Sequence, residues 1–108
     1  MKHDPPRLKV EYGTDITIAT ICNPKILDEA QIAELRQLLD PVIEHNGTAR
    51  LLLNFENVRF MTSAMLGLLV RVHKNVRQNG GRLEILNLDP NLRKVFEIAQ
   101  LTKILTIK

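Results

Sequence analysis

Residues 51–69 read LLLNFENVRFMTSAMLGLL and contain the clearest structural pattern in the chain. The three leucines at the start form a continuous apolar run, which is typical of a strand covered on both faces. After a polar connection, the adjacent hydroxyls of Thr62 and Ser63 precede an apolar helical stripe that continues to Val72 and Val76. The stretch therefore predicts a buried strand, a connection and an amphipathic helix, the repeating unit of an α/β protein.

The same alternation of strands and helices extends in both directions. Upstream, Gly13-Thr14-Asp15 separates two β-rich stretches and predicts a hairpin. Downstream, Asn79-Gly80-Gly81 ends the helix, because glycine readily adopts the left-handed turn of a helix C-terminus. Further elements are predicted as strands at 8–12, 16–21, 83–88 and 104–107, and as helices from Asp28-Glu29 to Asn46-Gly47 and from Asp89-Pro90 to Ala99. The order β-β-α-β-α-β-α-β predicts one α/β domain over residues 1–108, with a mostly parallel sheet covered by helices.

The first predicted helix contains a proline. Its apolar positions between Ile32 and Ile43 share one face. Pro41 lacks the N–H that an interior helical residue donates, so we expect the helix to kink there or to restart with Asp40 as its cap.

Length and composition restrict the class of protein. The chain has 108 residues, of which 44% are hydrophobic and 25% charged, as in an ordinary globular domain. No apolar run approaches the roughly 20 residues that span a bilayer. Residues 1–6 lack the apolar core of a signal peptide and are expected to be flexible. The single Cys22 cannot form an internal disulfide, so we expect a cytoplasmic protein. Because it has no long apolar run, we also expect no association with membranes.

The net charge of +3 is modest and spread along the chain. The densest basic stretch, from Arg71 to Arg82, has no aromatic residues between its charges. A nucleic-acid-binding protein usually shows a sharper patch or a known fold signature. We interpret the stretch as a solvated helix face and expect no nucleic-acid partner.

The chain shows no pattern of a metal site or of an enzyme. The candidate ligands His3, His45, His73 and Cys22 are far apart, and none forms a paired-ligand spacing. Ser63 lacks the flanking glycines of a nucleophile elbow, and no base or paired carboxylate accompanies it. The sequence thus predicts no metal, no cofactor and no catalytic residue.

The hydroxyls of Thr62 and Ser63 allow two interpretations. Either can be the N-cap of the following helix, a structural role sufficient to explain its presence. Alternatively, one of them accepts a phosphate, which a helix N-terminus tolerates because its free N–H groups and dipole favour negative charge.

Two further groups of residues support a family resemblance. The predicted element order resembles that of a STAS domain. So do two stretches of sequence: Leu51 to Val58 followed by Phe60 to Gly67, and Gly80-Gly81-Arg82-Leu83 leading to Asn87-Leu88-Asp89-Pro90. Within that family the chain is similar to bacterial anti-sigma factor antagonists, over nearly its whole length from Leu8. The resemblance implies a binding module for transcription regulation and not an enzyme.

The resemblance also implies a phosphorylation site. In the family the junction reads Asp-Ser-Ser-Gly-Leu-Gly, and its first serine is phosphorylated by a partner that is both a serine kinase, using ATP, and an anti-sigma factor. That serine corresponds to Ser63, and Thr62 is an alternative acceptor. Thr62 stands where the family has aspartate, and Ala64-Met65 replaces the Ser-Gly step.

The partner-binding surface implied by the resemblance comprises Arg59, Met61, Thr62, Ser63, Ala64 and Met65. For Met65 a position in the core is an equal alternative. The missing aspartate motivates a second hypothesis, in which the domain is a STAS interaction scaffold without a phosphoswitch. Such a scaffold would associate with itself or other STAS domains, or regulate a transporter or a stress complex.

Overall fold

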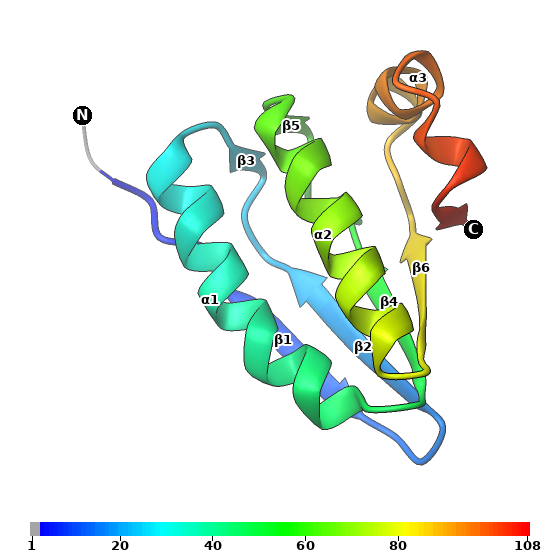
Figure 1. Ribbon diagram of the computed structural model, residues 1–108. Coiled ribbons are helices and arrows are strands. Elements are labelled where there is room, and N and C mark those ends of the chain that lie inside the picture. The colour runs from blue at the N-terminus through cyan, green and yellow to red at the C-terminus, as the bar shows by residue number, and fades with distance from the viewer. Residues whose placement is uncertain (1–2) are drawn as a thin grey trace.

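The computed structural model describes residues 3–108, and its elements alternate as the sequence predicts (Figure 1). The predicted α/β class and element order are confirmed. Two additional strands, β3 and β5, have two residues each and therefore carry no periodicity that a sequence could reveal. The elements are β1 (Leu8–Tyr12), β2 (Ile16–Ile21), β3 (Lys25–Ile26), α1 (Glu29–Asn46), β4 (Arg50–Asn54), β5 (Phe60–Met61), α2 (Ala64–Gln78), β6 (Arg82–Leu86), α3 (Pro90–Ile98), a 3-10 turn (Leu101–Lys103) and β7 (Thr106–Ile107).

The main sheet has the strand order β1-β2-β4-β6-β7, in which only β1 is antiparallel to its neighbour. The short strands β3 and β5 form a separate parallel pair. Two predicted strand ends differ from the structure. β6 ends at Leu86 because Asn87 has a φ of 56°, in the left-handed region, which turns the chain away from the sheet. The 3-10 turn occupies the segment before Thr106, so β7 is shorter than predicted.

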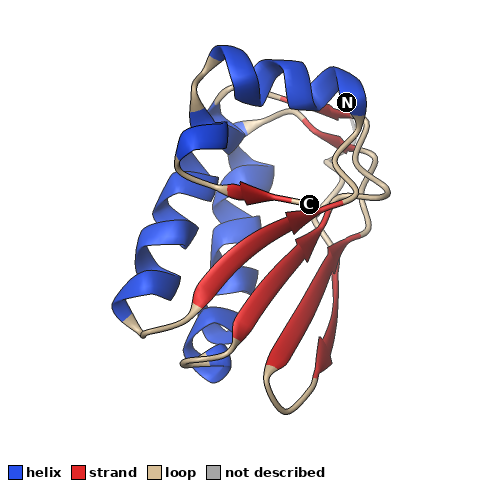
Figure 2. Cartoon of the chain, turned by 90° about the vertical axis from the view of Figure 1, so that its right-hand side faces the viewer, coloured by secondary structure: helices blue, strands red, loops and turns tan. Residues whose placement is uncertain are grey.

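The helices α1 and α2 pack together on one face of the sheet, and α3 lies across one end of it (Figure 2). Leu51 and Leu53 point toward these helices and are fully buried. Helices therefore cover only one face of β4. Leu52 points to the other face, where its register neighbours are Ile18 and Glu84, and is only 7% exposed, so both faces of the strand are covered as predicted.

Helix α1 is a single helix, so the predicted restart at Asp40 does not occur. It begins at Asp28, whose carboxylate accepts from the Gln31 N–H at 2.7 Å while Gln31 Oε1 accepts from the Asp28 N–H, a reciprocal capping box. Pro41 lies on the exposed side of the helix. The carbonyl that loses its helical partner, that of Gln37, is also on an exposed residue and can be solvated by water.

Residues 3–6 lie against the start of α1. The His3 ring is 2.6 Å from the Glu34 carboxylate, the Asp4 carbonyl accepts from the Gln31 amide, and Pro6 is buried. The buried Asn23 donates to Asp4 and Pro5. The expectation of flexibility for residues 1 and 2 lies outside the described residues.

None of the helices between residues 3 and 108 combines the length and the apolar composition that a membrane-spanning helix needs.

The face of the sheet opposite the helices contains a buried ion-pair network. Glu84 is 2% exposed, and its carboxylate accepts from Arg50 Nε at 2.6 Å and lies 3.0 Å from Lys108 Nζ. The hydrogen bond from Arg50 lowers the pKa of Glu84 to about 2, assisted by Lys108 and opposed by burial. A depressed pKa in the folded state stabilises the fold above the unfolded-state value of 4.5, and this contribution is lost as the pH falls toward 2.

We expect Glu84→Gln to make the free energy of unfolding less sensitive to acid. Between pH 4.5 and 2 the wild-type protein should lose up to about 3 kcal/mol more than the variant, since only the wild-type carboxylate must be protonated. Urea unfolding at a series of pH values measures both. Glu11→Gln, at an exposed position on edge strand β1, is the matched control and should follow the wild type. Equal acid sensitivity of the wild type and Glu84→Gln would refute the assignment.

Candidate functional site

The connection between β5 and α2 presents the Ser63 hydroxyl to solvent. Ser63 is the residue that precedes the first helical residue, Ala64, but its φ of −62° and ψ of −25° are already helical. A capping side chain usually needs an extended backbone in order to fold back over the first turn. The Ser63 side chain accordingly makes no capping hydrogen bond, and its hydroxyl remains available.

Thr62 does not cap α2 either. Its Oγ1 is buried and has no hydrogen-bond partner among the described residues. Its backbone anchors the junction instead, because its N–H donates to the Ile26 carbonyl at 3.1 Å and its carbonyl accepts from the Met65 N–H at 3.0 Å. The expectation that one of the two hydroxyls forms the cap is therefore wrong.

The start of α2 has two backbone donors without a protein acceptor among the described residues. The Leu66 N–H donates to the Ser63 carbonyl at 3.0 Å. The N–H groups of Ser63 and Ala64 precede the helical hydrogen-bond ladder and have no protein acceptor within residues 3–108. Together with the helix dipole, these donors favour an anion at this position.

Met65 belongs to the core. Its side chain is fully buried among the residues beneath α2. Of the two positions considered for Met65, the structure therefore supports the core, and its inclusion in a docking surface is a correction. Ala64 and Arg59 are exposed, whereas Met61 and Thr62 are half-buried.

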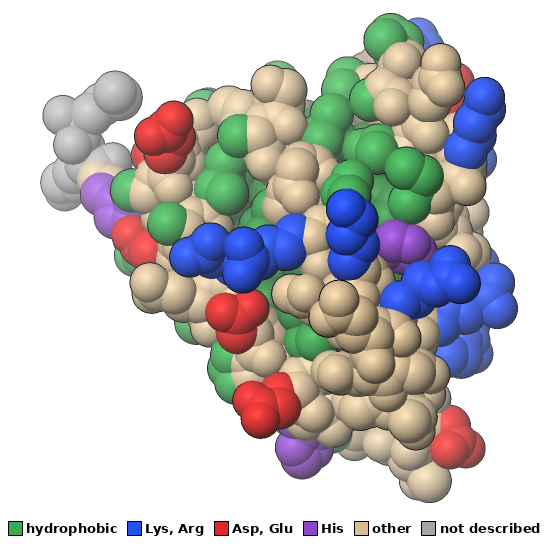
Figure 3. Space-filling model, in the orientation of Figure 1, with side chains coloured by type: hydrophobic (Ala, Val, Ile, Leu, Met, Phe, Trp, Pro, Cys, Tyr) green, Lys and Arg blue, Asp and Glu red, His purple; other side chains and the backbone are tan. Residues whose placement is uncertain are grey.

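A groove of about 410 Å³ lies beside the junction, between the β3–β5 pair and the start of α3. Figure 3 shows further apolar side chains between α2 and α3, on the face of the molecule that carries α2, although the groove itself is lined by no residue of α2. Phe60 is 57% exposed, and Leu27 and Val95 are also exposed. Such a group of exposed apolar side chains favours binding of another molecule. The groove is lined by Leu27, Arg59, Phe60, Met61, Asp89, Asn91, Leu92 and Val95.

Charged groups hold the wall of this groove in place. The Arg59 guanidinium lies 3.7 Å from the Asp89 carboxylate and donates to the Glu56 carbonyl at 3.1 Å. Asp89 also caps α3 by accepting from the Asn91 N–H at 2.8 Å. Arg59 therefore links the β5 connection to the start of α3, so its charge is already partly neutralised before any partner binds.

Sequence reasoning placed Arg59 and Met61 at this surface but missed the apolar groove. Phe60 stands in the same junction, and its exposure could have been suspected from the alternation with Met61. Leu27 and Val95 could not have been found in this way, because they come from the connection before α1 and from α3, which only the folded chain brings together.

The other candidate residues of the sequence lie elsewhere. Among the described residues, no group of three or more His, Cys, Asp or Glu side chains is close enough together to hold a metal ion. His45 packs edge-on against Tyr12, with ring centroids 4.3 Å apart. Cys22 is half-buried after β2, and its thiol lies 3.8 Å from the Thr20 carbonyl.

Comparison with known proteins supports one family. The family model of the STAS domain matches residues 9–108. The anti-sigma-B factor antagonist of Staphylococcus aureus is 35% identical over 81 residues, which cover 75% of this chain and 74% of that protein. The anti-sigma F factor antagonist of Paenibacillus polymyxa is 26% identical over 101 residues, which cover 94% of this chain and 85% of that protein.

Solved structures have the same fold. The Bacillus cell fate determinant SpoIIAA in its phosphorylated form aligns with a TM-score of 0.68 at 21% identity, over 94% of this chain and 91% of that one. An anti-sigma factor antagonist domain protein from Planctomyces limnophilus aligns with a TM-score of 0.79 at 15% identity, over 93% of this chain and 87% of that one.

The absence of a capping bond at Ser63 leads to a stability prediction. Ser63→Ala should change the free energy of unfolding by less than about 0.5 kcal/mol, because no hydrogen bond is lost. Asp28→Ala is the matched comparison at a helix start that is capped, and should cost about 1 kcal/mol. Urea unfolding measures both. A loss for Ser63→Ala as large as that for Asp28→Ala would show that Ser63 caps α2 in solution.

Proposed function

This chain belongs to the STAS domain family, and on that premise we propose that it is an anti-sigma factor antagonist switched by phosphorylation of Ser63. Unphosphorylated, it binds an anti-sigma factor and so releases a sigma factor for transcription. The anti-sigma factor is also the serine kinase and uses ATP. The named relatives support the class of function, and the exposed, uncommitted Ser63 hydroxyl supports the switch.

The position of Ser63 suits a modification that leaves the fold intact. A phosphate adds about −1.5 to −2 charges and strong acceptor oxygens. At the start of α2 it meets the free N–H groups of Ser63 and Ala64, and the hydroxyl that it occupies makes no structural bond. Thr62 is the poorer acceptor, because its Oγ1 is buried and out of reach of a kinase.

The groove next to the junction supplies a surface for the partner. Met61 lines it and is separated from Ser63 by one residue, so a phosphate on Ser63 lies near its rim. An anti-sigma factor that packs on Phe60 would have to accommodate and desolvate this dianion. A few kcal/mol of such cost is sufficient to abolish micromolar binding.

Phosphorylation should occur at Ser63 alone. The purified protein, incubated with its cognate anti-sigma kinase and ATP, should gain one phosphate by intact-mass spectrometry. Ser63→Ala should gain none, whereas Thr62→Val should be modified like the wild type, since it removes a buried and unpaired hydroxyl. Equal modification of the wild type and Ser63→Ala would refute the site.

Binding should depend on Phe60 and on the charge at Ser63. Phe60→Ala should weaken the binding of the unphosphorylated protein to the anti-sigma factor about tenfold, as expected for removal of an aromatic anchor. Ile98→Ala is the matched control, because Ile98 is 83% exposed on α3 but does not line the groove. Isothermal titration calorimetry with the anti-sigma factor measures both.

The variant Ser63→Asp separates the two hypotheses about regulation. It should remain folded and bind the anti-sigma factor more weakly than the wild type. Unchanged affinity would refute the phosphoswitch and leave a STAS interaction scaffold, in which the groove binds its partner whatever the state of Ser63.

A further inference from the structure

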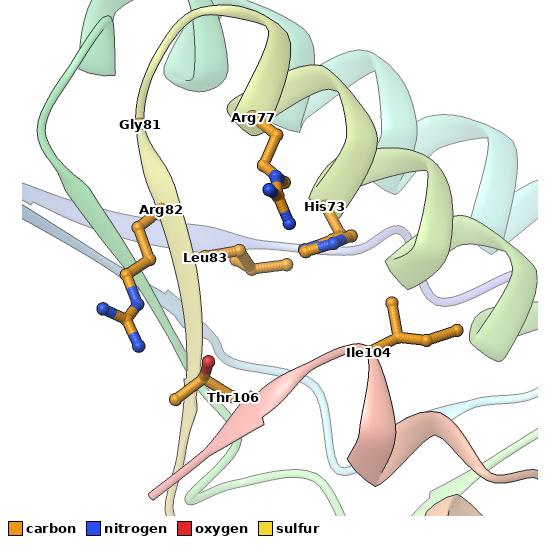
Figure 4. A pocket seen from close by; sticks show the side chains of 7 residues that line it. All are labelled: His73, Arg77, Gly81, Arg82, Leu83, Ile104 and Thr106. Carbon is orange, nitrogen blue, oxygen red and sulfur yellow. The ribbon is translucent and has the colours of Figure 1, made fainter.

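A second hollow, of about 350 Å³, lies away from the junction, where the C-terminal half of α2 faces the beginning of β6 (Figure 4). Arg77 and His73 project from α2 on one side of β6, and Arg82 and Thr106 lie on the other side. β7 pairs with β6 only at Glu84 and Ile85, so before Glu84 the edge of β6 that faces away from β4 has no strand beside it. The hollow therefore follows an open sheet edge.

The charged groups of this hollow are all cationic. Arg77 and Arg82 line it, no carboxylate does, and neither arginine has an ion-pair partner among the described residues. By contrast, Arg50 and Arg59 each lie close to a carboxylate. Figure 3 shows Lys and Arg side chains along the same edge of the molecule. Although the two guanidinium groups lie on opposite sides of β6, both add positive potential to the hollow, and each can bind a carboxylate or phosphate, so the hollow favours an anion.

His73 adds a polar group without a partner. Its Nδ1 is buried and neither donates nor accepts a hydrogen bond within residues 3–108. Burial lowers the pKa of His73 below its ordinary value of 6.5, and the positive charges of Arg77 and Lys74 lower it further. Arg82, Thr106 and Ile104 border the same hollow from the other elements, and none of them carries a negative charge. At neutral pH the ring is thus an uncharged imidazole that still has one N–H to donate.

The hollow also has an apolar part. Leu83 is 2% exposed and forms its floor, and Ile104 is 49% exposed at its side. A volume of about 350 Å³ lies in the range of sites for small molecules. A ligand that satisfies all these groups needs both an anionic and an apolar portion.

We propose that this hollow binds a small organic anion, with a carboxylate or phosphate group in the field of Arg77 and Arg82 and an apolar portion against Leu83 and Ile104. The His73 imidazole and the Thr106 hydroxyl are the uncharged hydrogen-bonding groups of the site. The proposal does not depend on the phosphoswitch, since none of its residues belongs to the Ser63 junction or to the neighbouring groove.

The experiment is a titration of the isotope-labelled protein with phenyl phosphate, benzoate and inorganic phosphate, followed by NMR. Phenyl phosphate or benzoate should cause saturable shifts at His73, Arg77, Arg82, Leu83 and Thr106. The stronger of these two ligands identifies the preferred anionic group. Inorganic phosphate should bind more weakly than phenyl phosphate, because it lacks the apolar portion. Binding should also raise the pKa of His73, since a nearby anion stabilises the imidazolium.

Variants test whether the arginines act specifically. Arg77→Gln and Arg82→Gln should each weaken binding about tenfold, the usual effect of losing one charge-assisted hydrogen bond. Both residues are exposed, so the fold should persist, which the dispersion of the same spectra verifies. Arg71→Gln is the matched control, because Arg71 is an exposed arginine on the same helix outside the hollow.

Two results would overturn the proposal. One is the absence of saturable shifts at the hollow with both phenyl phosphate and benzoate. The other is an equal weakening by Arg71→Gln and Arg77→Gln, which would mean that the ligand senses only the net charge of the protein.

Discussion

Parallel pairing of β2, β4 and β6 determines where the groove beside the Ser63 junction lies. Parallel strands must all leave the sheet at the same edge, so the three connections that follow them meet at one end of the molecule. The groove takes Leu27 from the connection after β2, Phe60 from that after β4 and Val95 from the helix after β6. No single segment of the chain could form this surface, and it exists because the strands are in register.

Polar contacts hold these connections together at the sheet edge. The Asn54 side chain donates to Thr20 at the end of β2 and accepts from the Asn87 amide, which follows β6. The Arg59–Asp89 pair repeats the link farther out. A groove whose walls are connected in this way is largely formed before a partner binds, which reduces the conformational entropy lost on association.

The sequence predicted the pattern of elements well, because each long element has a clear period and a clear end, such as Asp28 at α1. It failed where tertiary context decides. The strands β3 and β5 are too short to show a period and form only because the chain segments before α1 and α2 lie side by side. The sequence also did not show that helices lie on one face only, since Leu52 and Glu84 are both buried on the face without helices, the latter while paired with Arg50 and Lys108.

The candidate site shows the same division. Ser63, Ala64 and Arg59 are exposed as expected, since a helix start next to a sheet edge faces solvent, whereas the burial of Met65 depends on the rotational phase of α2. The same rotational phase also explains why the Thr62 hydroxyl is buried while the Ser63 hydroxyl is exposed. With Ser63 already in helical conformation, α2 effectively begins one residue early, which directs the Thr62 hydroxyl inward and leaves the Ser63 hydroxyl outside. A residue used as a cap would have its oxygen occupied by backbone N–H groups. Here the Ser63 hydroxyl makes no such bond, and the N–H groups of Ser63 and Ala64 have no protein acceptor within residues 3–108, so this helix start favours an anion.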